Sequence, residues 1–133
     1  VYYLAPDRET LLQVTTDLVQ PNGIVGTPDG SRVYIADQGA GRLWAYQPAE
    51  DGSLSDKRLF VSQGSDGLTM DERGNLYVTG QDITIFDPSG EPIASIGVPE
   101  PPANLTFGGR EGTTLFITAR TSLYRVDMLV TGQ

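Results

Sequence analysis

Three short phrases, spaced about 40 residues apart, each carry one small side chain whose oxygen atom can bind a cation. The first phrase contains Asn22, the second Asp66 and the third Asn104. Amide and carboxylate oxygens are the hard ligands that calcium, magnesium and manganese prefer. A carboxylate such as that of Asp66 can also accept a proton during hydrolysis. If the repeats lie around a ring, we expect these side chains to converge on its axis.

The composition excludes several other kinds of site. The chain has 133 residues and contains neither histidine nor cysteine, so it can form no disulfide, no Ser-His-Asp triad and no zinc site with imidazole or thiolate ligands. Its formal net charge is −8, which argues against nucleic acid, because contacts with phosphates require clustered lysine and arginine. No apolar run approaches the roughly 18 residues of a membrane span. We therefore expect one domain that binds neither nucleic acid nor a membrane.

An aromatic residue follows each phrase and keeps the same spacing, at Tyr34, Tyr77 and Phe116. A fixed period of this length indicates a repeat architecture. Between the phrases, short runs of β-branched and aromatic residues alternate with turns rich in glycine and proline, which is typical of short strands. Four antiparallel strands in about 40 residues form one blade of a β-propeller. The sequence therefore predicts an all-β chain that is a fragment of a β-propeller.

The same pattern gives the expected boundaries: a half blade at residues 1–20, whole blades at 21–62 and 63–100, and a last, three-stranded blade at 101–133. Propellers need about four to eight blades, so the chain is too short to close a ring. Its first and last strands would leave open edges that pair with another chain or with a missing N-terminal half of the propeller. The expected strands before the last blade are Val1–Leu4, Leu11–Thr15, Ile24–Gly26, Val33–Ala36, Arg42–Tyr46, Lys57–Val61, Leu68–Asp71, Leu76–Thr79, Ile83–Phe86 and Pro92–Ile96.

Three stretches together resemble the gluconolactonase and senescence marker protein family of six-bladed propellers. They are Pro21–Asp37, with its PNG, TPDG and VYIAD motifs, Ser65–Val78, with SDG and DERGNLYV, and Phe107–Tyr124, with FGG and LFITARTSLY. In this order the stretches correspond to the C-terminal half of that family. The resemblance therefore implies about half of a six-bladed propeller.

The resemblance also implies a hydrolase that opens a sugar lactone, such as an aldonolactone, with one divalent metal in the central channel. In the family a glutamate, an asparagine and an aspartate hold this metal. Asn22 and Asp66 match the last two, whereas the glutamate has no counterpart in this chain. We expect calcium, with magnesium, manganese or zinc as alternatives. The metal would polarise the lactone carbonyl and activate a water, and Asp66 would also be a catalytic residue that accepts a proton.

Each of these residues also has a purely structural interpretation. Asn22 and Asp66 precede glycines and fit ordinary turns. Asn104 fits either the lining of a substrate pocket or a hydrogen bond at the end of a strand, and Arg120 fits a structural pairing better than a contact with substrate. Two other functions also stay open, namely a related calcium-dependent esterase or organophosphatase, and a propeller without catalysis, either a binding module or an inactive half-ring.

Overall fold

The computed structural model describes all 133 residues and consists of short strands joined by turns. None of its segments forms a helix of the length and apolarity needed to cross a membrane. The strands are β1 (Tyr2–Leu4), β2 (Leu11–Gln13), β3 (Pro21–Gly26), β4 (Val33–Asp37), β5 (Arg42–Pro48), β6 (Leu54–Val61), β7 (Leu68–Met70), β8 (Leu76–Thr79), β9 (Ile83–Phe86), β10 (Pro92–Ile96), β11 (Pro102–Gly108), β12 (Thr114–Ala119) and β13 (Leu123–Asp127).

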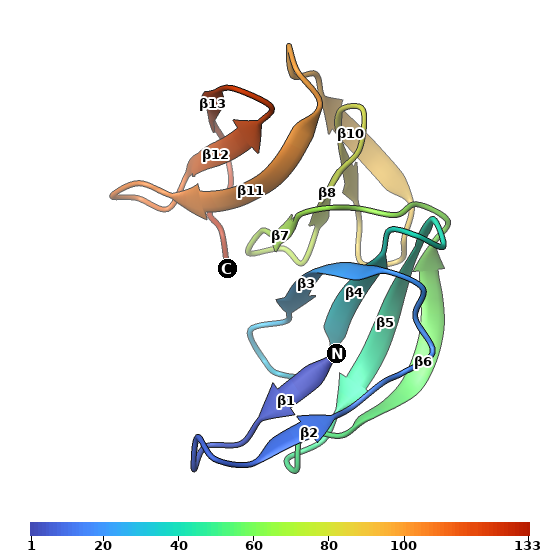
Figure 1. The fold of residues 1–133 in the computed structure, drawn as a ribbon. Coiled ribbons are helices and arrows are strands. Elements are labelled where there is room, and N and C mark those ends of the chain that lie inside the picture. The colour runs from blue at the N-terminus through green and yellow to red at the C-terminus, as the bar shows by residue number, and fades with distance from the viewer.

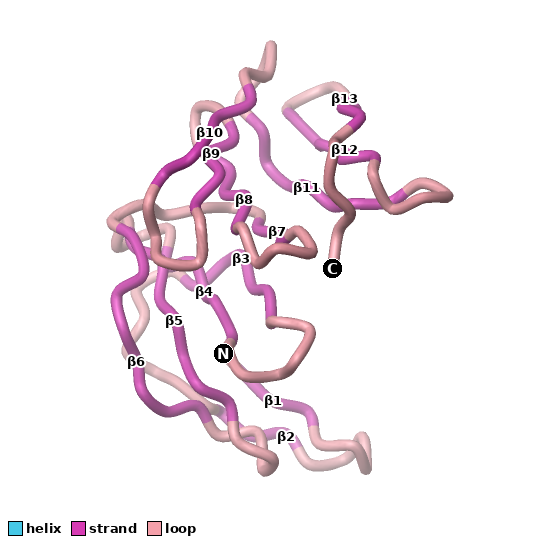
Figure 2. Tube along the Cα trace, turned by 180° about the vertical axis from the view of Figure 1, so that it is seen from behind, coloured by secondary structure: helices cyan, strands magenta, loops and turns pink.

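Each sheet is built from consecutive strands that pair antiparallel with their neighbours. In chain order the sheets contain β1–β2, β3–β6, β7–β10 and β11–β13. They follow one another along an arc, with the β1–β2 hairpin at one end and the β11–β13 sheet at the other (Figure 1), and the same succession is visible from behind (Figure 2). Strand β7 contacts both β3 and β11. The first strands of the three larger sheets therefore lie next to one another, and the prediction of an all-β chain of antiparallel sheets is confirmed.

Most strands begin within one or two residues of the expected positions, but two begin earlier. Strand β3 starts at Pro21 rather than Ile24, and β6 starts at Leu54 rather than Lys57. The pairing register of β3 shifts between Pro21 and Ile24, and that of β6 shifts around Asp56, which adopts a φ of 51°. A bulge breaks the alternation of side chains along a strand. Periodicity alone therefore could not show that these two strands continue through the irregularity.

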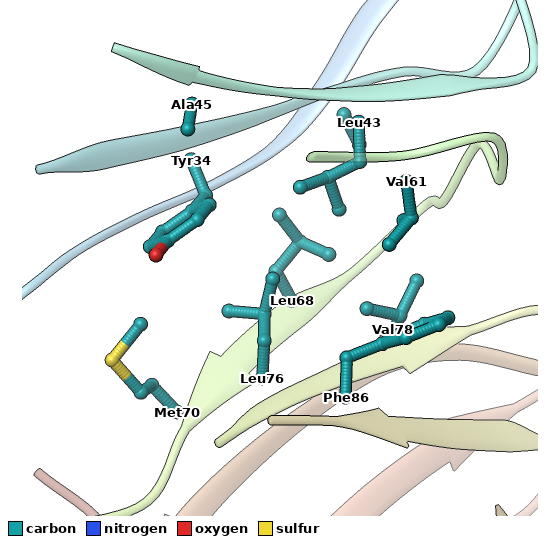
Figure 3. Close-up of a cluster of buried hydrophobic side chains, with 10 residues drawn as sticks. Tyr34, Leu43, Ala45, Val61, Leu68, Met70, Leu76, Val78 and Phe86 are labelled. Carbon is teal, nitrogen blue, oxygen red and sulfur yellow. The ribbon is translucent and has the colours of Figure 1, made fainter. Parts of the chain in front are cut away.

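The hydrophobic core lies between neighbouring sheets. Figure 3 shows the larger cluster, gathered between the β3–β6 sheet and the β7–β10 sheet. Its buried members are Tyr34, Ala36, Leu43, Ala45, Val61, Leu68, Met70, Leu76, Val78 and Phe86. A second cluster joins the β7–β10 sheet to the β11–β13 sheet through Tyr77, Ile83, Ile85, Leu105, Leu115 and Ile117. Since both clusters contain residues of two successive sheets, they hold β3, β7 and β11 in defined relative positions.

Candidate functional site

The side chains of Asn22 and Asp66 meet although they belong to different sheets. Nδ2 of Asn22 donates hydrogen bonds to Oδ1 of Asp66 at 2.6 Å and to Oε1 of Gln38 at 3.1 Å. Asn22 lies in the irregular part of β3, where the register shifts, and Asp66 lies just before β7. Both side chains are exposed. The structure thus brings two of the predicted site residues together at one accessible point, and Asp66 Oδ2 makes no hydrogen bond to the chain.

Two glycines allow the first strands of successive sheets to approach this closely. A Cβ atom on Gly23 would lie 2.9 Å from the carbonyl oxygen of Asp66, and one on Gly67 would lie 2.6 Å from the Cα atom of Asn104. Real Cβ atoms do not approach other heavy atoms to such distances. A glycine in a strand often marks a place where another backbone comes near. The glycine that follows Asn22 and the glycine that follows Asp66 are therefore required by packing.

The third phrase is displaced by one residue relative to the first two. Residues Ile24, Leu68 and Leu105 occupy equivalent places, because they pair with Ile35, Val78 and Ile117 in the second strand of their sheets. A glycine precedes the first two of these residues, but Asn104 precedes the third. Asn104 therefore occupies the glycine position, and Ala103 stands where Asn22 and Asp66 stand. The spacing that made Asn104 equivalent to Asn22 was misleading, because it counted residues without the register of the ladder.

Asn104 packs closely against Gly67, the residue after Asp66, but makes no hydrogen bond to Asn22 or Asp66. Its Oδ1 accepts a hydrogen bond from the backbone N–H of Leu105 at 2.8 Å. It lines a cavity of about 310 Å³ together with Phe116 and Leu123, and it is absent from the lining of the cavity beside Asp66. The structure does not bring Asn104 together with Asn22 and Asp66, and its place in a substrate pocket stays a prediction.

A polar cavity of about 340 Å³ opens beside Asp66. Its lining includes Gln38, Gln81 and Arg120, which are exposed. Sequence reasoning missed both glutamines and expected a structural pairing for Arg120. This chain offers no such partner, because its three ion pairs are formed by other basic residues. The signal that could have found all three residues is their shared position, just after the second strand of each sheet.

Buried hydroxyl groups hold the segment that carries Asp66. The Thr79 hydroxyl accepts a hydrogen bond from the backbone N–H of Gly67 at 3.0 Å, and the Ser65 hydroxyl donates to the carbonyl oxygen of Gly67 at 2.7 Å. The two hydroxyl oxygens are themselves 3.0 Å apart. Ser65 and Thr79 are buried. The backbone on both sides of Asp66 is therefore fixed, while its carboxylate stays accessible.

A buried carboxylate supports the turn that presents Gln38. Asp37 accepts hydrogen bonds from the backbone N–H groups of Val19 at 3.0 Å, Gln20 at 2.8 Å and Ala40 at 3.3 Å. Burial by itself raises the pKa of Asp37, but these N–H donors outweigh burial and hold the pKa below its ordinary value. Asp37 is thus ionised at neutral pH, and it ties the segment before β3 to the turn after β4.

Glu100 performs the same task for the turn that presents Arg120. Its carboxylate accepts hydrogen bonds from the backbone N–H of Thr121 at 2.9 Å, from the Ser122 hydroxyl at 2.8 Å and from the Tyr124 hydroxyl at 3.4 Å. The Thr121 N–H is the main reason that the pKa of Glu100 is lowered, with the Ser122 hydroxyl next. The carboxylate stabilises the β12–β13 turn and leaves the guanidinium of Arg120 without an ion pair.

The donor set of Asn22 and Asp66 fits a hard cation as part of a larger ligand set. No group of three histidine, cysteine, aspartate or glutamate side chains gathers anywhere in the chain. The pair would therefore contribute two ligands to a cation, one amide oxygen and one carboxylate oxygen. Rotating the Asn22 amide by half a turn exchanges Nδ2 for Oδ1 and brings an amide oxygen to the same point as the carboxylate. Calcium accepts such oxygen ligands in irregular geometry, together with waters.

Comparison with known proteins gives the family of the chain. The model of the SMP-30/gluconolactonase/LRE-like region matches residues 1–121. A gluconolactonase from Zymomonas mobilis is 31% identical over 141 aligned positions, which cover 95% of this chain and 39% of that protein. The chain thus spans less than half the length of this relative.

Solved structures give the same result for the fold. A gluconolactonase from Xanthomonas campestris matches with a TM-score of 0.84 and 29% identity, over 99% of this chain and 44% of its own. Regucalcin from Agrobacterium tumefaciens, described as a calcium-binding protein, matches with a TM-score of 0.88 and 21% identity, over 99% of this chain and 53% of its own. The fold is therefore part of a propeller, as the sequence predicts, and the chain belongs to the SMP-30/gluconolactonase/LRE-like family.

Proposed function

We propose that the complete protein to which this chain belongs is a lactonase that opens a sugar lactone of the aldonolactone type. One observation carries the proposal: Asn22 and Asp66, the two matches to the family's metal-binding residues in this chain, meet at a hydrogen-bond distance of 2.6 Å beside a polar cavity. The name gluconolactonase in the relatives supports a lactone as the substrate.

Asn22 and Asp66 would hold a divalent cation, for which we propose calcium. The regucalcin neighbour is described as calcium-binding, and the oxygen donors of the pair suit this ion. When bound, the cation would polarise the lactone carbonyl and make water a better nucleophile. Asn22 would contribute a neutral ligand. Of the ligands in this chain, Asp66 alone would therefore offset the positive charge of the ion.

Asp66 would also act on the proton of the attacking water. Without a cation, Oδ1 of Asp66 accepts a hydrogen bond from Asn22, whereas Oδ2 has no hydrogen bond to the chain, and the residue is exposed. A water that adds to the lactone carbonyl must lose a proton, the ring C–O bond then breaks, and the ring oxygen must gain a proton to give the open hydroxy acid. Asp66 would take the first proton as general base and return it to the ring oxygen.

The open ends of the arc would pack against the rest of the ring. At one end, Tyr2 and Leu11 of the β1–β2 hairpin are each 61% exposed, and at the other end Leu123 of β13 is 67% exposed. The cavity beside Leu123 is lined in part by Thr106 and Phe116, on the face of the β11–β13 sheet opposite to the core residue Leu105. Since the relatives are more than twice as long as the matched region, we propose that an N-terminal half of the propeller covers both ends.

The test uses the complete protein and a panel of aldonolactones, simple esters and an organophosphate. We expect ring opening of the lactones, abolished by a chelator and restored by calcium. Asp66→Ala should lower kcat by about 10²- to 10⁴-fold, the range for loss of a general base. It should also weaken calcium binding measured by calorimetry. Asp29→Ala is the matched control, because Asp29 is an exposed aspartate in the turn between β3 and β4.

The alternatives give different results in the same panel. Turnover of the esters or the organophosphate without lactone opening would favour the related esterase. Full lactone opening in Asp66→Ala, or in the presence of the chelator, would contradict the proposed roles of the pair. An intact protein that neither binds calcium nor turns over any compound of the panel would support a propeller without catalysis.

A further inference from the structure

Three long polar side chains occupy equivalent positions in successive sheets. Gln38, Gln81 and Arg120 each lie three residues beyond the central residue of the second strand, which is Ile35, Val78 or Ile117. Gln38 and Arg120 directly follow β4 and β12, and Gln81 is the second residue after the end of β8. Equivalent positions in repeated sheets come to the same rim of a propeller. The fold therefore places two amides and one guanidinium in a row on the rim that carries Asp66.

All three side chains line the cavity that also contains Asp66. Arg120 is the only basic residue of this lining, and it has no acidic partner within the chain. A guanidinium carries five N–H donors in a planar fork, which matches the two oxygens of a carboxylate. Since the chain carries a net charge of −8, its overall field opposes the approach of an anion, and an anionic group of a ligand needs such a local cation.

The turn that presents Arg120 is built rigidly. Glu100 accepts hydrogen bonds from the N–H and the hydroxyl of Thr121, at 2.9 and 3.1 Å, and from the Ser122 hydroxyl at 2.8 Å. These donors engage both carboxylate oxygens of Glu100, which forms no ion pair with Arg120. A fixed backbone reduces the entropy that a bound ligand must overcome. The backbone that carries Arg120 is therefore fixed, while its guanidinium has no ion pair within the chain.

We propose that Arg120 is a specificity-determining residue that binds a carboxylate substituent of the substrate, so that the enzyme prefers sugar lactones bearing a second, free carboxylate over neutral aldonolactones. The inference rests on the proposed lactonase function. Gln38 and Gln81 supply amides for the hydroxyl groups between this carboxylate and the lactone ring. A carboxylate suits the site better than a phosphate, because its single charge matches that of Arg120, whereas the lining holds no further basic residue for a phosphate's second charge.

The experiment compares two lactones with the same ring, one ending in a neutral hydroxymethyl group and the other in a carboxylate. In the complete protein, we expect a higher kcat/KM for the carboxylate-bearing lactone. Arg120→Gln should reduce the ratio of the two kcat/KM values by about ten- to a hundred-fold, the range for a charge-assisted hydrogen bond. Arg110→Gln removes the same charge from a side chain that is 96% exposed in the β11–β12 turn, and it should leave the ratio unchanged.

A binding measurement separates this inference from the proposed function. The open-chain dicarboxylate and monocarboxylate products are titrated against the wild-type protein and Arg120→Gln, with ligand-observed NMR as the readout. Weaker binding of the dicarboxylate alone in Arg120→Gln supports the inference, even if no lactone is opened and the proposed function fails. An unchanged ratio of kcat/KM, or equal binding of the dicarboxylate by both proteins, would overturn the inference while leaving lactone opening intact.

Discussion

The amide nitrogen of Asn22 lies 2.6 Å from a carboxylate oxygen of Asp66, although the two residues are 44 positions apart in the chain. Each stands at the inner edge of its own sheet, and Gly23 packs directly against the backbone of Asp66. The repeat thus brings one side chain from each of two distant phrases into direct contact.

Asn22→Asp would place two carboxylates side by side where an amide and a carboxylate now form a hydrogen bond. Without metal, we expect the exposed pair to lower the free energy of unfolding by about 1 kcal/mol, because like charges repel even in water. With calcium, the added charge should strengthen binding and enlarge the rise of Tm that calcium produces. Thermal melts with and without calcium measure both effects. Asn22→Ala is the control and should reduce the response to calcium, and an equal response of both variants would contradict the prediction.

Gly67→Ala tests the close approach of the second and third phrases. The new Cβ atom would lie 2.6 Å from Cα of Asn104 and would also clash with its Oδ1. The two strands must move apart, and we expect the free energy of unfolding to fall by about 1–3 kcal/mol. Gly26→Ala is the control, because the nearest atom there is 3.7 Å away, and it should leave stability unchanged or raise it by about 0.4–1 kcal/mol. Urea denaturation distinguishes the two variants, and equal stabilities would show that the close approach has no energetic weight.

Asp37→Asn tests the buried carboxylate beneath Gln38. The asparagine retains one acceptor oxygen but presents an N–H₂ group to one of the backbone N–H donors, Val19 or Gln20. We expect the free energy of unfolding to fall by about 1–3 kcal/mol, the usual result of leaving a buried polar group unpaired. Glu111→Gln removes the same charge from a side chain that is 79% exposed, and it should change stability by less than about 0.5 kcal/mol. Equal losses in the two variants would mean that charge, and not the hydrogen bonds, is responsible.

Glu100 should make the β12–β13 turn sensitive to acid. Hydrogen bonds from Thr121 and Ser122 lower the pKa of Glu100 below 4.5 in the folded protein. Its contribution to stability is therefore complete above the unfolded value near 4.5 and is lost as the pH falls through the lower folded value. The protection factor of the Thr121 amide proton, which is the intrinsic exchange rate of an unstructured peptide at the same pH divided by the observed rate, should fall on acidification when it is measured by NMR between about pH 2.5 and 6. Glu100→Gln should remove this pH dependence, and the same dependence in the variant would exclude Glu100 as its source.

Much of the fold could be predicted because repeats and turns are local features. The pattern of short apolar runs identified strands such as β8 and β9 with their observed bounds, Leu76–Thr79 and Ile83–Phe86. Bulges were not predictable, because the residues inside them resemble ordinary turns. This limit delayed the expected start of β3 to Ile24. It also concealed that Asn104 replaces a glycine instead of matching Asn22.

The residues of the candidate site were likewise predictable only in part. Asn22 and Asp66 could be proposed because each is preceded and followed by a recognisable motif. Arg120, Gln38 and Gln81 carry no motif of their own, since an exposed polar residue after a strand is common on any surface. Their equivalent positions after the second strands are visible in the spacing, but that they share one cavity depends on how separate sheets pack.

The period, most strands, the family resemblance and the available ligand types, which are oxygen donors without histidine or cysteine, can all be read from the amino-acid sequence. These properties follow from the order of residues along one chain. Which oxygen donors meet depends on the packing of the sheets, because the contact of Asn22 with Asp66 requires two cores that hold neighbouring sheets together and glycines that let their backbones approach. The folded structure has a second consequence. It also decided that Arg120 faces the cavity of Asp66 without an ionic partner, since the strand register and the Glu100 hydrogen bonds direct the turn that carries it.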